Sequence, residues 1–358
     1  AVRVEPGRSL QEAVRAHPEG TTFVLGAGVH RGQSVVPKRG NTFLGEAGAV
    51  LDGGGESRAF HGRVADVTIR GLVVQNYASA DLHAAIDGNG SSGWVVAGNE
   101  VRHNRSFGIR VGTGGQVVGN YVWGNGRAGI TGCCGRSGGL VEGNQLVGNG
   151  GDLSFDSGTR SAIKVTNFTD LVVRANSVHD NPLHGIWVDI DSSEVRIEDN
   201  LVVDNGGIGI YFEISYQGLI RRNTVEANAT RGIFVSNSTG VEVTENLVRD
   251  NGDGISGFQG ERGSGAHGPR DLRDLWVHHN LVTMSAGYSG ITTTVAGDSV
   301  FSEWGNRFEA NTYTICGVQE PFRWMGPRTI AEWQGLGHDS AGTWLECRSA
   351  YAPFAEPS

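Results

Sequence analysis

Apolar residues occur along this chain in many short runs, and glycine, asparagine and other polar residues separate these runs. Residues 72–74 and 201–203 are examples that are rich in valine and leucine. Runs of this length between turn residues predict short β-strands joined by tight turns. Near the start of the chain, Ser9 and Glu12 instead form a capping-box pattern, which predicts a short helix ending near His17.

Asparagine recurs along the chain at intervals of 21 to 34 residues, each time two positions before an apolar residue. The positions are Asn99, Asn120, Asn144, Asn176, Asn200, Asn223, Asn246 and Asn280. A second asparagine follows most of these by five positions, at Asn104, Asn125, Asn149, Asn181, Asn205, Asn228 and Asn251. A unit this short cannot bury a core of its own, so the period predicts a solenoid whose stacked coils share one core.

The residues between the asparagines indicate which kind of solenoid forms. Leucine-rich repeats have a similar period but need about five leucines per repeat, whereas valine, isoleucine and glycine dominate here. A right-handed parallel β-helix, an all-β fold with Asn or Gly at its turns, fits this composition. Turn asparagines adopt left-handed backbone angles readily, and we expect them to hydrogen-bond to one another along the stack.

The ends of the solenoid and its loops divide the chain into regions. We expect a single domain with an N-terminal cap over residues 1–30, coils over 31–311 and an irregular C-terminal cap over 312–358. The predicted N-terminal helix would cover the open end of the core. Two repeats are longer than the others, with insertions near 150–160 and 254–272. Loops on a rigid scaffold are where binding residues concentrate.

Composition narrows the class of partner. Glycine accounts for 57 of the 358 residues without a collagen-like period, and the formal net charge is −9 with a pI near 5.7. This acidic balance argues against a nucleic-acid or anionic-membrane partner, and no apolar run approaches the ~18 residues of a membrane span. The chain begins at Ala1 without methionine, as a processed secretory protein does, so we expect a secreted bacterial protein.

Four cysteines carry further expectations. Cys316 and Cys347 flank the C-terminal segment and would form a disulfide in an exported protein. Cys133 and Cys134 are adjacent, and because vicinal disulfides are strained and uncommon we expect two unbonded, buried residues in a glycine-rich turn. No zinc-site spacing of cysteine or histidine occurs in the sequence, so neither a structural metal nor a cofactor is expected.

One face of the solenoid can be aligned from coil to coil because strand side chains alternate between core and solvent. Taking the isoleucine of each Gly-Ile pair as inward aligns Ile109, Ile130, Ile163, Ile186, Ile210 and Ile233. The next residue then points outward, which gives the row Arg110, Thr131, Lys164, Trp187, Tyr211 and Phe234. The outward row two positions further on contains Gly112, Cys133, Thr166, Asp189, Glu213 and Ser236.

The second row brings two acids together. Asp189 and Glu213 are 24 residues apart, which is also the local repeat length. On neighbouring strands they would lie roughly 5 Å apart, which is about the separation of nucleophile and acid/base in a retaining glycosidase. Two close carboxylates separate in pKa, and the proximity of Lys164 favours Asp189 as the ionised one.

The residues around the acids are candidates for binding sugar. Exposed aromatic rings in the stripe formed by Trp187, Tyr211 and Phe234 would stack on the apolar face of a sugar ring. Lys164, His184 and Asp191 are expected to hydrogen-bond substrate hydroxyls, and Arg110 is a further candidate for binding substrate. The same stripe also fits a structural role, in which the second insertion covers it and no ligand binds.

Residues 185–191, 198–205 and 209–216 resemble the active-site coils of glycoside hydrolase family 120, the β-helical β-xylosidases. That family shows a Gly-Leu-Trp-x-Asp element and, one coil later, an apolar-x-Glu element. This chain has Gly-Ile-Trp-Val-Asp and, one coil later, Gly-Ile-Tyr-Phe-Glu. The resemblance covers about 40 residues. The resemblance implies that Asp189 is the nucleophile and Glu213 the acid/base of a retaining hydrolase acting on a neutral, pentose-containing oligosaccharide or polysaccharide. The β-sandwich insertion of that family is not seen in the sequence.

Other functions of the same scaffold stay open. A polysaccharide lyase or uronate epimerase would use Lys164 or Arg110 as base and a Ca²⁺ ion held by Asp189, Asp191 and Glu213. Against it, the face has no basic cluster for a polyanion. A fructan-type glycosyl transferase would pair the same two acids at the interface of a homo-oligomer. A non-catalytic carbohydrate-binding solenoid would bind sugars without turnover.

Overall fold

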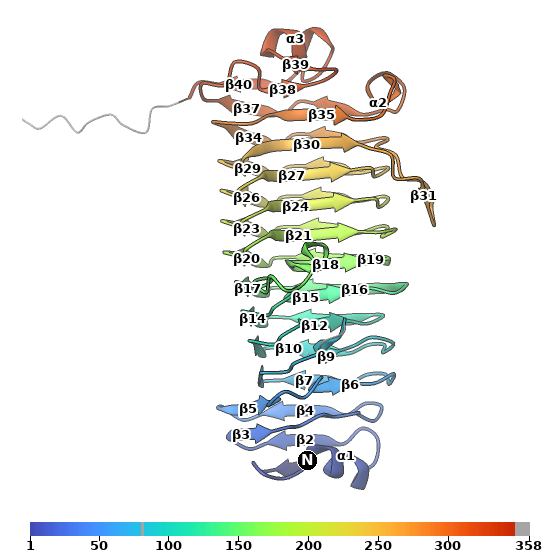
Figure 1. Ribbon diagram of the computed structural model, residues 1–358, viewed down its shortest axis with the longest axis vertical. Coiled ribbons are helices and arrows are strands. Elements are labelled where there is room, and N and C mark those ends of the chain that lie inside the picture. The colour runs from blue at the N-terminus through green and yellow to red at the C-terminus, as the bar shows by residue number, and fades with distance from the viewer. Residues whose placement is uncertain (80–81, 348–358) are drawn as a thin grey trace, which may run out of the picture.

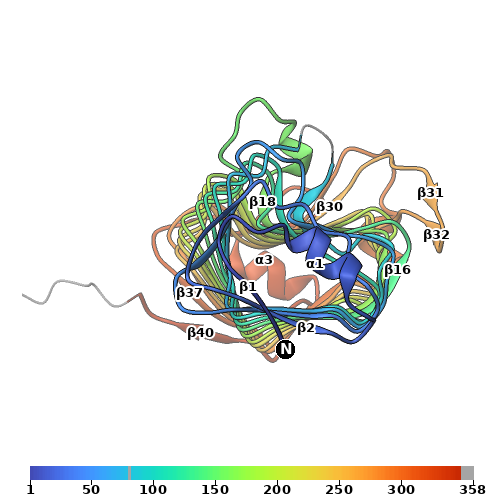
Figure 2. The ribbon, with the colours of Figure 1, turned by 90° about the horizontal axis from the view of Figure 1, so that it is seen from below.

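Each repeat of the chain forms one coil of short strands in the computed structural model, which describes residues 1–79 and 82–347. Corresponding strands of successive coils pair in parallel, so the coils stack into three long sheets around a narrow core (Figures 1 and 2). The expected all-β, right-handed parallel β-helix is therefore confirmed. Among the described residues, no helix is long and apolar enough to cross a membrane.

The three sheets are named A, B and C in the order in which the chain visits them in each coil. Sheet A contains β1 (Val2–Val4), β2 (Thr22–Leu25), β4 (Thr42–Gly45), β7 (Thr68–Arg70), β10 (Val95–Ala97), β13 (Gly115–Val118), β16 (Arg136–Glu142), β19 (Phe168–Arg174), β22 (Arg196–Glu198), β25 (Leu219–Arg221), β28 (Glu242–Thr244), β33 (Trp276–His278) and β36 (Arg307–Glu309).

Sheet B contains β3 (Gly28–Arg31), β5 (Ala49–Asp52), β8 (Val73–Gln75), β11 (Glu100–Arg102), β14 (Tyr121–Trp123), β17 (Gln145–Val147), β20 (Ser177–His179), β23 (Leu201–Val203), β26 (Thr224–Glu226), β29 (Leu247–Arg249), β34 (Leu281–Met284), β37 (Thr312–Ile315) and β40 (Thr343–Leu345). Sheet C contains β6 (Phe60–His61), β9 (Ala84–Asp87), β12 (Phe107–Val111), β15 (Ile130–Gly132), β18 (Ser161–Thr166), β21 (His184–Asp189), β24 (Ile208–Glu213), β27 (Arg231–Ser236), β30 (Asp253–Gln259), β35 (Ser289–Thr293), β38 (Phe322–Arg323) and the antiparallel β39 (Pro327–Arg328).

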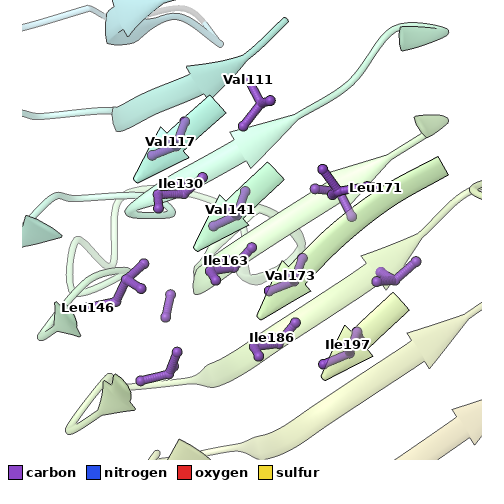
Figure 3. Packing of buried hydrophobic residues seen from close by; sticks show 14 of the residues in the cluster. Val111, Val117, Ile130, Val141, Leu146, Ile163, Leu171, Val173, Ile186 and Ile197 are labelled. Carbon is purple, nitrogen blue, oxygen red and sulfur yellow. The ribbon is translucent and has the colours of Figure 1, made fainter. Parts of the chain in front are cut away.

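The core is a set of columns in which each coil contributes one apolar side chain per sheet position. In sheet C, Ile130, Ile163 and Ile186 are consecutive partners and are fully buried. Val141 and Val173 form a matching column in sheet A and face the isoleucines across the core (Figure 3). Burying such a side chain stabilises the fold by about 1.5–3 kcal/mol, so every added coil extends the same core.

The repeating asparagines form two ladders inside the turns. One runs through the first asparagine set and continues past Asn280 to Asn311 and Asp339, and the other runs from Asn104 to Asn251. In both ladders, every asparagine before the last donates from its amide to the side-chain oxygen of the next one along the stack, and the last asparagine of the first ladder, Asn311, donates to Asp339. The expected hydrogen bonding between asparagines is thus confirmed, and it makes the turn of one coil the template for the next.

The backbone angles of these turns differ from expectation. The left-handed residue is not the ladder asparagine but the residue before it, such as Asp199 (φ 56°) before Asn200 and Ala175 (φ 53°) before Asn176. The physical reason is that the ladder amide must point into the stack to bond its neighbours. The preceding residue faces outward and absorbs the reversal of the chain.

Both ends of the solenoid are covered. At the first end, α1 (Leu10–Ala16) begins as predicted, with the Ser9 side chain accepting a hydrogen bond from the Glu12 N–H at 3.2 Å. Leu10 and Val14 are buried in the core cluster, and α1 lies across this end of the solenoid (Figure 2). The strand ladders themselves begin at Val2, inside the segment expected to be a cap.

At the other end, two short helices, α2 (Ser299–Ser302) and α3 (Ile330–Gly335), pack on the last coils. The expected Cys316–Cys347 disulfide is present, with its Cα atoms 5.3 Å apart, and ties β40 to the end of β37. In α3 the fully buried Trp333 stacks on Phe322 at 4.4 Å between ring centres. Positions 348–358 of the expected cap lie outside the described residues.

Both insertions adjoin sheet C. Residues 150–160 connect β17 of sheet B to β18 of sheet C and contain a 3₁₀ turn at Ser157–Thr159. The second insertion begins at residue 260 and not at 254, because Asp253–Gln259 form the regular strand β30. Residues 260–272 connect β30 of sheet C to sheet A and contain the hairpin β31 (Ser264–Gly265) and β32 (Gly268–Pro269). The two loops therefore project from opposite edges of sheet C and flank its outer face (Figure 2).

The ladders lead to a stability prediction at Asn144, which is buried. Its amide donates to Asn176 Oδ1 and Val117 O, and its Oδ1 accepts two hydrogen bonds from Asn120, all at 2.9 Å. Asn144→Ala leaves these buried groups without partners, at about 1–3 kcal/mol each. We expect the free energy of unfolding in urea to fall by about 3 kcal/mol.

Gln145→Ala is the matched control, because this exposed amide is the next residue along the chain. We expect it to change the free energy of unfolding by less than about 0.5 kcal/mol. Equal effects of the two substitutions would contradict a structural role for the ladder.

Candidate functional site

The outer face of sheet C carries the two rows aligned from the sequence. Lys164, Trp187, Tyr211 and Phe234 are consecutive register partners on β18, β21, β24 and β27. In the second row, Thr166 pairs with Asp189 and Glu213 with Ser236. Since Val188 pairs with Phe212, Asp189 and Glu213 occupy the same position on neighbouring strands. The coil-to-coil alignment of these two rows that was predicted from the sequence is therefore confirmed by the strand register.

Asp189 is buried at the end of β21, and both of its carboxylate oxygens are engaged. Lys164 Nζ lies 2.7 Å from Oδ2, and the backbone N–H of Ile190 donates to Oδ1 at 2.8 Å. Burial raises the pKa of Asp189, the charge of Glu213 adds to this rise, and the Lys164 ammonium opposes it. Burial likewise lowers the pKa of Lys164, against the attraction of Asp189.

Glu213 is held by a side chain of the second insertion. Arg262, from the second insertion, donates from Nη1 to Glu213 Oε1 at 2.6 Å. Burial raises the pKa of Tyr211, and the nearby Glu213 carboxylate adds to the rise. The Arg262 side chain is 40% exposed, whereas Lys164 is buried. The two acids therefore differ in how easily their cations can be displaced.

The aromatic stripe is packed more closely than an open platform would be. Trp187 and Tyr211 stack at 5.2 Å between ring centres, but Trp187 is only 8% exposed. Lys164 Nζ lies 3.0 Å from the centre of the Trp187 ring, and Arg231 covers Phe234 at 4.0 Å. The expected solvent-exposed stripe is therefore wrong, because cations lie over the rings and gain cation–π attraction there.

His184 joins two coils beside the stripe. Its Nδ1 accepts a hydrogen bond from the Ile208 N–H at 3.1 Å, so the ring proton is on Nε2. Burial, with help from the Lys164 charge, lowers the pKa of His184 to about 4. The imidazole is therefore neutral near pH 7, and it packs edge-on against Trp187 at 5.0 Å.

Asp191 anchors the second insertion. Arg270 donates to both of its carboxylate oxygens, at 3.0 and 3.3 Å, and the Tyr216 hydroxyl donates to Gly268 O at 2.8 Å. These contacts hold the β31–β32 hairpin beside the acids and so place Arg262. The expected binding role of Asp191 for sugar hydroxyls remains a proposal, because in the structure this carboxylate already has Arg270 as a partner.

A cavity of about 450 Å³ lies on the outer face of sheet C, on the N-terminal side of Asp189. Asp189 and Lys164 form one end of it, and Arg110, paired with Asp87 at 3.5 Å, forms the other. The first insertion contributes one wall. The remaining lining residues are Leu82, His83, Asn89, Phe107, Thr131, Cys133, Cys134, Gly158, Thr159, Thr166 and Ile190. Glu213, Trp187 and Tyr211 lie beyond this cavity along the stack.

Cys133 and Cys134 form a disulfide with each other, so the expectation of two unbonded, buried cysteines is wrong. Cys134 has a positive φ of 74°, and it is exposed rather than buried. The physical reason is that the turn after β15 leaves sheet C toward the cavity. Beyond the adjacent cysteines and the length of the insertion, the sequence has no signal for this bond or for the pairing of Arg262 with Glu213.

The carboxylates are dispersed among cations. Within residues 1–79 and 82–347, no group of three or more His, Cys, Asp or Glu side chains is placed to hold a metal ion. Asp189, Asp191 and Glu213 pair with Lys164, Arg270 and Arg262 respectively. The calcium site considered for a lyase or epimerase is therefore not formed by these three acids.

Comparisons with known proteins place the chain among β-helices. The profile described as right handed beta helix region matches residues 31–188 and 84–248. A comparison with curated proteins finds no match. Among solved structures, the A-module of the mannuronan C-5 epimerase AlgE6 from Azotobacter vinelandii is similar, with 16% identity, a TM-score of 0.66 and 94% of each chain covered.

Two further structures are similar. A mannuronic acid specific polysaccharide family 6 lyase from the human gut microbiota has 11% identity and a TM-score of 0.58, over 97% of this chain and 91% of the lyase. XylC, solved in complex with xylose, has 14% identity and a TM-score of 0.53, over 72% of this chain and 52% of XylC. At these identities the likeness shows the fold.

The residue after each acid has an unusual backbone conformation. Ile190 and Ile214 have φ of 39° and 37°, whereas the matching positions on the flanking coils are Asn167 and Asn237. A β-branched residue in this left-handed region is strained by about 1–3 kcal/mol. Asparagine tolerates the region, so of these four coils only the two that carry the acids are strained at this position.

Ile190→Asn relieves this strain while keeping the N–H that bonds Asp189. Because Ile190 is 42% exposed, little apolar burial is lost. We expect the free energy of unfolding in urea to rise by about 1 kcal/mol. Leu201→Asn, at a similarly exposed residue in an ordinary strand, is the control and should give no gain; a gain there, or none at Ile190, would argue against strain.

Proposed function

This chain belongs to the right-handed beta helix region family, and from its site we propose that it is a retaining glycoside hydrolase with Asp189 as nucleophile and Glu213 as acid/base. The main support for this proposal is that the two acids occupy the same register position on neighbouring strands. Parallel strands lie about 4.8 Å apart, and retaining enzymes need about 5–5.5 Å between their carboxyl groups. An inverting enzyme needs roughly 6.5–9.5 Å to admit a water molecule.

The environment of Asp189 supports the nucleophilic role. Lys164 and the Ile190 N–H fix both carboxylate oxygens and favour the anion. Burial, which raises the pKa, also removes water that would otherwise solvate the anion and weaken its attack. The carboxylate forms one end of the cavity, where the anomeric carbon of a bound sugar would be placed.

The environment of Glu213 supports the acid/base role. A general acid must carry a proton when the glycosidic bond breaks and take one back when water enters. Arg262 holds the carboxylate in the ligand-free structure, but its side chain is partly exposed and lies on a loop. We propose that the bound substrate displaces Arg262, that Glu213 then takes up a proton from solvent, and that it donates this proton to the leaving oxygen as the glycosidic bond breaks.

A neutral glycan is the substrate class that this charge arrangement favours. In the described lining of the cavity, Lys164 faces Asp189 and Arg110 faces Asp87, so each cation has an acidic partner. A uronate unit would meet no uncompensated positive charge there. The bound xylose of the similar structure XylC agrees with the proposal of a pentose-containing substrate.

Uronate lyase or epimerase chemistry is the second candidate. Burial lowers the pKa of Lys164, which brings this amine nearer to the range where it can act as a base. Two of the structurally similar proteins are a mannuronan C-5 epimerase and a mannuronic acid specific lyase. A lyase would release an unsaturated product from mannuronan with new ultraviolet absorbance, and a hydrolase would not.

We also propose that the protein is secreted. Both cysteine pairs of the described chain are bonded, and such bonds persist in oxidising compartments outside the cytosol. A polysaccharide or oligosaccharide substrate would be encountered there.

Azide rescue tests the assignment of the acids on aryl xylosides, with arabinofuranosides, glucosides and fucosides as further probes. Asp189→Gly should lower kcat at least about a thousandfold, because no covalent intermediate forms. Azide should restore turnover and give a glycosyl azide of inverted configuration. Glu213→Ala should retain activity mainly on substrates with good leaving groups, and azide should then give the retained configuration.

Ser236→Ala is the control, since Ser236 occupies the same row one coil further on. It should keep activity within about twofold of the original protein. Full activity in Asp189→Asn, or rescue products with the two configurations exchanged, would contradict the assignment.

A further inference from the structure

The Cys133–Cys134 disulfide lies at the cavity on the same outward row as Asp189. Cys133 follows directly after Gly132, the partner of Val165, so it stands opposite Thr166 and two coils from Asp189. Two strand spacings amount to about 10 Å. A sugar unit next to the one bound at Asp189 would therefore lie over the sulfur atoms.

This bond has no evident role in stabilising the chain. A disulfide stabilises a protein mainly by closing a loop of the unfolded chain. Here the sequence separation is 1, so no loop is closed. The Cys316–Cys347 bond, with a separation of 31, is the structural one by the same argument.

The position of the bond gives it a chemical use instead. Cys133 is half-buried and Cys134 exposed, and both line the cavity together with the ring of Phe107. Bonded sulfur atoms lack the S–H donor and present a soft, polarizable, apolar surface. Linking adjacent residues also fixes this surface rigidly, which reduces the entropy lost when a ligand binds.

Polar groups surround this apolar floor. Thr131 is the register neighbour of Lys164 and belongs to the cavity lining. Asn89 lines the same cavity and accepts a hydrogen bond from Arg136 at 3.3 Å. An apolar surface with a few convergent polar groups is the usual composition of a small-ligand site.

We propose that the Cys133–Cys134 disulfide is the floor of a second sugar-binding subsite, which takes the C–H face of a neutral sugar unit adjacent to the one held at Asp189. Thr131 and Asn89 bind hydroxyl groups of that unit, and the 150–160 insertion covers it. This subsite rests on the proposed function, since it assigns the enzyme a substrate of more than one sugar unit.

Calorimetric binding of xylotetraose to the Asp189→Asn protein tests the subsite without requiring turnover. Adding Cys133→Ala and Cys134→Ala should weaken binding about tenfold, because the unit loses its rigid apolar contact. The melting temperature should change little, since the bond closes no loop. The Cys133→Ser/Cys134→Ser pair, which keeps the side-chain size but makes it polar, should weaken binding at least as much and replaces the alanine pair if that one misfolds.

Cys316→Ala/Cys347→Ala is the control, with a lowered melting temperature and unchanged affinity for xylotetraose. Equal affinity with and without the Cys133–Cys134 bond would overturn the subsite, and so would a failure of the Asp189→Asn protein to bind xylotetraose. Because binding is measured without catalysis, these results are independent of azide rescue: the hydrolase assignment can fail while the subsite holds, and the reverse.

Discussion

The fixed register of the stacked coils is the constraint on which the rest of this structure depends. Each ladder asparagine donates to the next one, so a coil cannot slip along its neighbour without leaving buried amides unpaired. The apolar columns also oppose a shift in register, because a slip by one residue would turn core side chains outward. Within this frame, residues one repeat apart become neighbours in space, which places Asp189 beside Glu213.

The regular strands supply both carboxylates and one of their cations, and an insertion supplies the other cation. Lys164 comes from the preceding coil and is buried, whereas Arg262 comes from an insertion that Arg270 anchors to Asp191. One acid therefore has a fixed partner and the other a displaceable one. Equivalent positions in a regular solenoid have similar backbone surroundings. The difference in cation partners is therefore what would give the two acids different chemical roles.

The regular features could be predicted from the sequence and the irregular ones could not. The fold, the asparagine ladders, the row register, α1 and the Cys316–Cys347 bond follow from periodic or local patterns. The cover over the aromatic rings depends on the rotamers of Lys164 and Arg231, which no period specifies. The vicinal disulfide and the path of the 260–272 insertion depend on turn geometry and long-range contacts, which a repeat pattern does not encode.

The stereochemistry of the first-formed product tests the central claim most directly, because it reports the separation of the two acids during catalysis. Proton NMR during hydrolysis of an aryl xyloside distinguishes the two anomers before mutarotation mixes them. Acids on adjacent strands predict that the first sugar released has the same anomeric configuration as the substrate. A first product of inverted configuration would contradict the account, because it would require a water molecule between carboxylates that the register places too close together.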